Sequence, residues 1–363
     1  MRIAAIICEY NPFHQGHRYQ IGAVRQRLGE DTGVLCLMSG NFVQRGEPAV
    51  YDKWSRAEAA VRGGADLVLE LPITAAVNAA GYFAAGAVDC LAQLGAVEYL
   101  CFGTEGTETE TLLENVRIME TEESEAALRD KLRTGVSFAR ARELALTELG
   151  GDGAVLAGPN NALGVDYLRR LAQIRSEIRP MAIPRKEGLP SATAIRAELT
   201  GSGIHRMEYG ERAMLAVLRT LPDSAFETMP FGSEGLWSKV RRACRREDSL
   251  EQILAACKSK RYAMSRLKRM LLCLYLGLSG EDLARGIPYL RVLAFNDRGR
   301  EMLRTLKKTA RLPLVSGSVP EDPASEAYFA MEVRATDLYG LFSPPGTAEP
   351  AGRERTVGPI YVR

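Results

Sequence analysis

The first half of the chain alternates short apolar runs with amphipathic stretches of helical length. The apolar runs lie at residues 2–8, 33–40, 66–72, 98–105 and 178–184. Near-continuous apolar strands that are separated by helix-length segments predict βαβ units, with right-handed crossovers and a parallel sheet covered on both faces. We therefore expect a doubly wound α/β domain over residues 1–200.

Two longer segments fit inside this alternation. Residues 110–149 carry many charges, with apolar residues at helical spacing, and predict two or three surface helices before the sheet resumes. The Ala-rich stretch 73–96 is interrupted by Asn78, Asp89 and Gln93, which favours a buried helix over a membrane span. We expect no membrane contact.

After about residue 207 the alternation stops. Segments 207–221, 249–260 and 262–278 are helical by period, and residues 288–306 read as a strand, a turn and a helix. The end of the chain is rich in Pro and Gly. The pattern predicts a mainly α-helical region over 201–345 and a flexible tail over 346–363.

Composition adds limits rather than detail. With 363 residues, 46% of them hydrophobic and 25% charged, the chain is typical of a globular protein of two or three domains. The 47 basic and 45 acidic residues nearly cancel, so net charge indicates no partner. Seven cysteines without a CxxC pair favour neither a disulfide framework nor a zinc site. The N-terminal apolar run leads into a motif rather than a cleavage site, so we expect a cytoplasmic protein.

That motif is EYNPFHQGH at residues 9–17, which contains two of the three histidines. It lies at the carboxyl end of the first strand, where open α/β sheets bind ligands. Pro12 ends the strand, and Gly16 permits a tight turn before a helix whose free N–H groups suit a phosphate. His14 and His17 lie on one side of the turn and can both donate hydrogen bonds. The inferred ligand is a nucleoside triphosphate.

Two other interpretations of the histidine pair stay open at this point. Histidines three residues apart can bind zinc, but a third protein ligand is needed and no further His or Cys cluster supplies one. Alternatively, both histidines could only cap the helix or pack against it.

The HxGH form of residues 14–17 resembles the signature of the nucleotidyltransferase superfamily that includes class I aminoacyl-tRNA synthetases, which implies a HUP or Rossmann-like fold. A second superfamily element, a Ser/Thr-rich turn opening a late helix, is matched by SATAIR at 191–196. The longer segments resemble the bacterial tRNA(Met) cytidine acetate ligase family, and these are residues 9–17, 38–60, 64–72, 101–105, 158–168, 191–196 and 288–303.

This resemblance implies an ATP-dependent ligase that activates acetate to acetyl-adenylate, with Mg²⁺ accompanying ATP and pyrophosphate released. The acetyl group would then pass to N4 of the wobble cytidine of elongator tRNA(Met), forming N4-acetylcytidine and AMP. The family pattern has a longer segment between Arg185 and Ser191, where this chain has only KEGLP. The shortened loop bears on the second step more than on the first.

Carried over by motif, the resemblance also implies site residues. His14 and His17 would be catalytic, holding the triphosphate and stabilising charge as pyrophosphate leaves. ATP would be bound by Ile7, Cys8, Glu9, Tyr10, Asn11, Pro12, Phe13, His14, Gln15, Gly16, His17, Arg18, Tyr19, Gln20, Gly103, Asn160 and Arg185. Further phosphate contacts would come from Ser191, Thr193 and Arg196.

Simpler interpretations accompany these assignments. Asn160 after Gly-Pro could be only a turn residue, Arg185 only a solvated cation, and Ser191 or Thr193 only a helix cap. Arg45 and Lys53 could meet the acetate carboxylate, the triphosphate or tRNA, or could be solvated surface charges.

Basic residues concentrate between 239 and 269, where eleven Lys or Arg stand against three acids. On predicted helices they form a basic face suited to a phosphate backbone, with Trp237 and Tyr262 able to stack on bases. A solvated face is the alternative. The candidate tRNA-binding residues are Arg241, Arg242, Arg245, Arg246, Lys258, Lys260 and Arg261.

Two other functions remain possible from sequence. A small-molecule adenylyltransferase of the same superfamily needs the same first site, but it needs no large basic helical region. An RNA-binding protein with a vestigial nucleotide site would keep the basic face and lose ATP binding.

Overall fold

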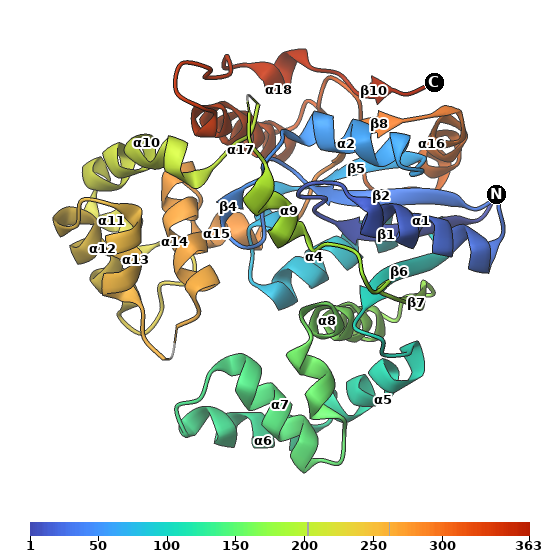
Figure 1. Cartoon of the computed structure of the whole chain (residues 1–363), viewed down its shortest axis with the longest axis horizontal. Helices are drawn as coiled ribbons and strands as arrows, with labels where there is room; N and C mark the ends of the chain where they lie inside the picture. Colours follow the sequence, from blue (N-terminus) through green and yellow to red (C-terminus); the bar gives the residue numbers. More distant parts are fainter. Residues whose placement is uncertain (202, 261) are drawn as a thin grey trace.

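The computed structural model of the chain describes residues 1–201, 203–260 and 262–363 (Figure 1). Its centre is a sheet with the strand order β10-β8-β5-β2-β1-β6-β7. The strands run parallel from β5 to β7, and β8 pairs with β5 in the antiparallel sense. Their bounds are β1 Ile3–Cys8, β2 Gly33–Ser39, β5 Leu67–Leu71, β6 Tyr99–Thr104, β7 Arg179–Pro184, β8 Leu290–Phe295 and β10 Ile360–Tyr361. The predicted doubly wound α/β fold is confirmed.

Both faces of the sheet are covered, which explains why its central strands read as continuous apolar runs. On one face, Ala4 and Ile6 of β1 pack with Val24 and Trp54 from the helices α1 (Gln15–Leu28) and α2 (Lys53–Arg62). Ile3, Ala5 and Ile7 point to the other face. That face is covered by α4 (Ala80–Gln93), α8 (Pro159–Gln173) and α16 (Asp297–Thr309).

Of the inserted surface helices, the first packs beside α8 and β7, and the other two lie farther from the sheet (Figure 1). They are α5 (Thr109–Met119), α6 (Glu122–Arg133) and α7 (Phe138–Glu148), followed by the 3-10 turn η1 (Gly153–Ala157). Short elements join the larger ones, namely β3 (Phe42–Val43), β4 (Glu47–Pro48), α3 (Ile73–Ala76), β9 (Leu314–Val315) and η2 (Gly340–Phe342).

A second group of helices packs around its own apolar core to one side of the sheet (Figure 1). Its members are α10 (Met207–Thr220), α11 (Asp223–Glu227), α12 (Leu236–Arg246), α13 (Leu250–Cys257), α14 (Met264–Leu276), α15 (Gly280–Ala284) and α17 (Pro323–Tyr339). The expected strand, turn and helix at 288–306 are β8, Asn296 and α16, but β8 returns to the main sheet. The region 201–345 therefore contributes to both cores.

The expectation of a flexible tail over 346–363 needs correction. These residues form α18 (Arg353–Thr356) and β10, which pairs with β8 beside the sheet. Glu354 is 1% exposed because its carboxylate meets two buried cations. The composition of residues 346–363 is typical of a loop, and the residues that hold this segment in place are far away in sequence. Among the described residues, no helix combines the length and apolar character needed to cross a membrane.

Candidate active site

The crevice lies where β1 stops pairing with β6. From β1 the chain builds β2 and β5 on one side and then returns to build β6 and β7 on the other. β1 pairs with β2 from Ile3 to Cys8, but with β6 only at Ala4 and Ala5. The strands thus separate toward their carboxyl ends, at a topological switch point where α/β sheets bind ligands. Residues 9–17 begin there.

The turn after β1 is anchored to its neighbours. The Asn11–Pro12 peptide bond is cis, and Asn11 Oδ1 accepts a hydrogen bond from Val50 N at 2.8 Å. The buried Tyr10 ring packs edge-on against Phe13, with 5.0 Å between centroids, and lies 4.6 Å from the His17 ring. Among the other candidate ATP-binding residues, Ile7 and Cys8 end β1, and Gln15, Arg18, Tyr19 and Gln20 lie on the first turns of α1.

His14 and His17 cap α1 and each other. His14 Nδ1 accepts from Gly16 N at 3.0 Å, and His17 Nδ1 accepts from His14 N at 3.2 Å. The rings stack with 3.7 Å between centroids. A Cβ atom at Gly16 would lie 2.9 Å from His14 Cε1, so this packing favours glycine. Because each Nδ1 accepts, the proton of each neutral ring is on Nε2.

The electrostatic surroundings keep both rings uncharged. Burial, His14 and the Arg185 guanidinium lower the pKa of His17 to about 3. Burial and then Arg185 also lower the pKa of His14. Near pH 7 the pair therefore offers two Nε2–H donors. Capping, which sequence left as an alternative, fixes the tautomer that a phosphate site needs.

SATAIR reaches the same turn through one arginine. Ser191 caps the short helix α9 (Ala192–Glu198) by accepting from Ala194 N at 3.2 Å. Arg196 donates to Thr193 Oγ1 at 3.0 Å and to the Asn11 carbonyl oxygen at 2.8 Å. The structure thus brings the two motifs together, although they are far apart in sequence.

The other predicted nucleotide residues lie on the far side of the crevice. A Cβ atom at Gly103 in β6 would meet nothing within 4 Å, so that position is open. Asn160 donates through its backbone and its side chain to Glu105 Oε1 at 3.0 and 2.7 Å. Arg185 follows β7, and its backbone N donates to the Thr104 carbonyl oxygen at 3.0 Å. Gly103, Asn160 and Arg185 are therefore neighbours at the carboxyl ends of β6 and β7.

Three residues that sequence reasoning did not single out support this site. Glu105 caps the N-terminus of α8 with both carboxylate oxygens. Arg56 is buried and donates to the carbonyl oxygens of Glu9, Ser39 and Gly40, which ties the ends of β1 and β2 together. Gln44 N donates to Glu9 Oε1 at 2.7 Å. The available signal for Arg56 was an arginine on the apolar face of a predicted helix.

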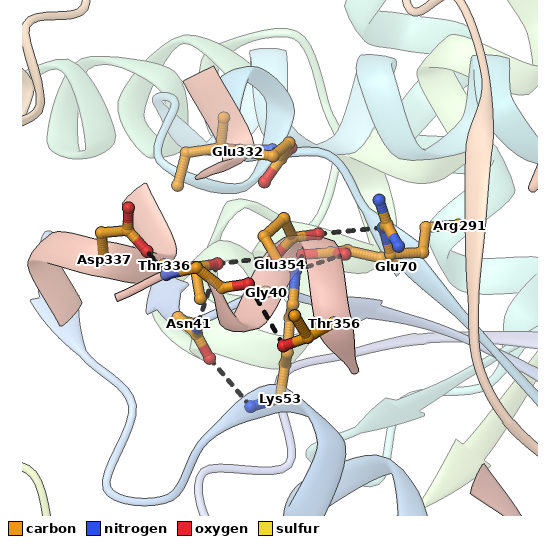
Figure 2. Close-up of polar contacts among 12 residues, drawn as sticks. Gly40, Asn41, Lys53, Glu70, Arg291, Glu332, Thr336, Asp337, Glu354 and Thr356 are labelled. Carbon is orange, nitrogen blue, oxygen red and sulfur yellow. Dashed lines mark hydrogen bonds and ion pairs between the residues drawn. The ribbon is translucent and has the colours of Figure 1, made fainter. Parts of the chain in front are cut away.

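Lys53 is buried, so neither the ligand contacts nor the solvated surface charge that sequence offered for it fits the structure. It is 0% exposed, with Nζ 2.7 Å from Glu70 and 2.6 Å from Glu354 (Figure 2). Arg291 contacts Glu354 from the other side at 2.9 Å. Burial raises the pKa of nearby Glu332 to about 8, helped by Glu70 and Glu354. Arg45, by contrast, is exposed at the edge of the crevice.

The basic residues of the helical region divide into two kinds. Arg241 pairs with Asp223, Arg245 donates to the carbonyl oxygens of Arg219 and Leu221, and Lys258 donates to that of Tyr262. The others, which are exposed and lack a partner among the described residues, are Arg242, Arg246 and Lys260. Arg261 lies outside the described residues.

The aromatic residues expected to stack on bases also have cations against them. Arg241 lies over the Trp237 ring at 6.0 Å, and Arg266 lies over the Tyr262 ring at 5.0 Å. Arg269 is buried, and burial lowers its pKa to about 10. Several cations of the predicted basic face therefore contact other residues of the helical region and are not free to bind a phosphate backbone.

Two features bear on other ligands. In the ranges that the structure describes, no group of three or more His, Cys, Asp or Glu is placed to hold a metal ion. A cavity of about 520 Å³ opens away from the crevice, next to Arg25, Asp66 and Arg298. None of the predicted site residues lines it.

Comparisons with known proteins find one family model, several relatives and solved structures that match nearly the whole chain. A family model described as HIGH Nucleotidyl Transferase matches residues 1–229 and 197–354. A protein of Acetivibrio thermocellus named tRNA(Met) cytidine acetate ligase is 31% identical, and the alignment covers 100% of both chains. The protein of that name from Thermoanaerobacter sp. is 34% identical over 94% of this chain and 95% of its own. The crystal structure of Thermotoga maritima TmcAL bound with alpha-thio ATP is 32% identical, with a TM-score of 0.91 and 100% of both chains covered.

Proposed function

The chain belongs to the tRNA(Met) cytidine acetate ligase family, and from this premise we propose how its crevice activates acetate with ATP and acetylates tRNA(Met). The substrate ATP is supported by the related structure from Thermotoga maritima, which is bound with alpha-thio ATP. We further propose that acetate is the acid that is activated, that Mg²⁺ accompanies ATP, and that the wobble cytidine of the elongator tRNA accepts the acetyl group.

The observation that carries the first step is the tautomer of the histidine pair. Both Nδ1 atoms accept backbone hydrogen bonds, so both Nε2–H groups are available to phosphate oxygens. An acetate oxygen attacks the α-phosphorus, and the bond to the bridging oxygen breaks as pyrophosphate leaves. One well-placed donor to the developing charge is typically worth roughly 3 to 4 kcal/mol. The Arg185 and Arg196 side chains add positive charge near the histidine pair.

Each further site residue has a physical role in this scheme. Open space at Gly103 lets the nucleotide approach the backbone of β6. Asn160 stands at the N-terminus of α8 with its amide already oriented by Glu105. Ser191 and Thr193 lie beside Arg196 on α9, where free helix N–H groups favour phosphate oxygens.

In the second step the exocyclic amine of the cytidine attacks the acetyl carbonyl and AMP leaves. Arg242, Arg246 and Lys260 are the exposed cations that we assign to the tRNA backbone. The other four candidate residues either have protein partners or lie outside the described residues. A small-molecule adenylyltransferase would use the first site but would leave these exposed cations without a substrate.

The test is to incubate the full chain with ATP, acetate and tRNA(Met), and to analyse the tRNA nucleosides by mass spectrometry. The proposal expects N4-acetylcytidine that depends on both ATP and acetate. Parallel incubations with ATP plus nicotinamide mononucleotide or phosphopantetheine test the adenylyltransferase. A new dinucleotide or coenzyme A precursor, without acetylcytidine, would overturn the proposal.

A further inference from the structure

Glu9 is a carboxylate beside the histidine turn of the crevice. A negatively charged side chain does not help to hold a triphosphate, so another role is needed for it. It follows the last residue of β1, and it is partly exposed. Its Oε1 accepts from Gln44 N at 2.7 Å, and its backbone oxygen accepts from Arg56 at 2.5 Å. Among the described residues nothing donates to Oε2. The side chain is therefore fixed through one oxygen, and the other oxygen is free to accept a proton.

The surroundings of Glu9 make it a stronger base than an ordinary carboxylate. Burial raises its pKa, although the Gln44 N–H group and the positive charges of Arg56, Arg45 and Arg196 oppose the rise. Tyr167 faces it from α8. A base near a reaction centre works best when its pKa lies closer to the working pH.

The acetyl transfer needs such a base, because the attacking amine gains positive charge and must lose a proton. The histidine pair cannot accept that proton, since each Nε2 already carries one and each Nδ1 accepts a backbone hydrogen bond. The other nearby carboxylates are occupied. Glu105 caps α8 with both oxygens, Glu47 pairs with Lys268, and Glu70 is buried against Lys53.

We propose that Glu9 is the general base of the acetyl transfer, an inference that rests on the proposed function. The nitrogen lone pair of cytidine N4 attacks the acetyl carbonyl carbon and forms the C–N bond. The N4 proton passes to Glu9 Oε2, and the bond between the acetyl carbon and the phosphate oxygen breaks. AMP leaves with that electron pair, and Glu9 then gives its proton to water.

Glu9→Gln is the deciding variant because the amide oxygen can still accept from Gln44 N, while proton uptake is lost. Two rates are measured, acetate-dependent pyrophosphate exchange into ATP and single-turnover transfer to tRNA(Met) from acetyl-adenylate formed on the enzyme. We expect transfer to fall on the order of 100-fold further than exchange. Glu47→Gln, in β4 of the segment that contacts Glu9 through Gln44, is the matched control and should leave both rates unchanged.

The pH dependence supplies a second readout. The wild-type transfer rate should fall as the pH is lowered through one ionisation above the ordinary range of a carboxylate, and Glu9→Gln should lose that dependence. Glu9→Asp keeps a carboxylate, so it should transfer the acetyl group slowly but retain the pH dependence. This second variant tests the inference even if the Glu9→Gln protein folds poorly. Wild-type transfer by Glu9→Gln, or an equal loss of exchange and transfer, would overturn the inference. A wild-type chain that forms no acetylcytidine would instead overturn the proposed function.

Discussion

Two groups of polar and charged side chains contact the segment at residues 39–53, and they differ in how their charges are balanced. The buried cluster contains Lys53, Arg291, Glu70, Glu354 and Glu332, all below a tenth exposed (Figure 2). The crevice group contains His14, His17, Glu9 and Arg196, which are partly exposed, and Arg185, which is exposed. In the cluster each cation meets a carboxylate, whereas in the crevice no described residue accepts a hydrogen bond from the Nε2–H groups of His14 and His17.

This difference separates stability from chemistry. With Glu332 protonated, the cluster has two carboxylates against two cations. Its buried charges then balance, which avoids the large cost of an uncompensated buried charge. The crevice group leaves Nε2–H donors and a carboxylate oxygen without partners among the described residues, and these are the atoms that a substrate can meet. We expect the cluster to hold the loop in place and the crevice to act on ligands.

The largest expected effect is loss of stability when the cluster loses a cation. Lys53→Ala leaves Glu70 and Glu354 buried without their main partner. Removing one partner of a buried pair typically costs about 3–5 kcal/mol in the free energy of unfolding. Urea unfolding followed by circular dichroism measures it. Arg62→Ala, which removes an exposed i,i+4 pair with Glu58, is the control and should change stability by no more than about 0.5 kcal/mol.

The next effect concerns the crevice and should appear in activity alone. His17→Ala removes one Nε2–H donor, and we expect acetate-dependent pyrophosphate exchange to fall about 100-fold to 1,000-fold. Gln26→Ala, exposed on the same helix α1 but outside the predicted site, is the matched control. An exchange rate equal to that of the wild type would remove His17 from the site.

A smaller effect is expected on tRNA affinity. Reversing Arg242, Arg246 and Lys260 to Glu should weaken tRNA binding by about 10-fold or more at low salt and reduce its salt dependence. Reversing Arg117 and Arg133 on the inserted helices, which are also exposed, should not. Filter binding across a salt series distinguishes the two sets. Equal weakening by both sets would contradict a specific basic surface, and pyrophosphate exchange should be unaffected by either.

The smallest effect sharpens the account of the cluster through pH. The pKa of Glu332 is about 8 in the folded chain and 4.5 as its ordinary value, so the folded state keeps this proton longer. Its contribution to stability is therefore complete at low pH and is lost as the pH rises toward 8. The stability of Glu332→Gln relative to the wild type should therefore increase as the pH rises from about 5 to about 8.5. A difference that does not change with pH would contradict the shift.

Sequence predicted the parts of the site that depend on local pattern. The HxGH turn at the end of the first strand and the SATAIR cap each follow from short segments in order. The same reasoning failed for Lys53 and for the tail, because Glu354 meets Lys53 and Arg291 only in the folded chain. It also left Glu9 as one letter of a motif, since only the structure shows which carboxylate oxygens are occupied.

The most direct test compares the two groups in one assay, as acetate-dependent pyrophosphate exchange per folded molecule for the wild type, Glu354→Gln and His17→Ala. The folded fraction of each sample comes from its unfolding curve. We predict that Glu354→Gln exchanges at a rate close to that of the wild type once unfolded chains are discounted, while folded His17→Ala is about 100-fold slower or more. Equal losses per folded molecule in both variants, or no loss in His17→Ala, would contradict the separation of the two groups.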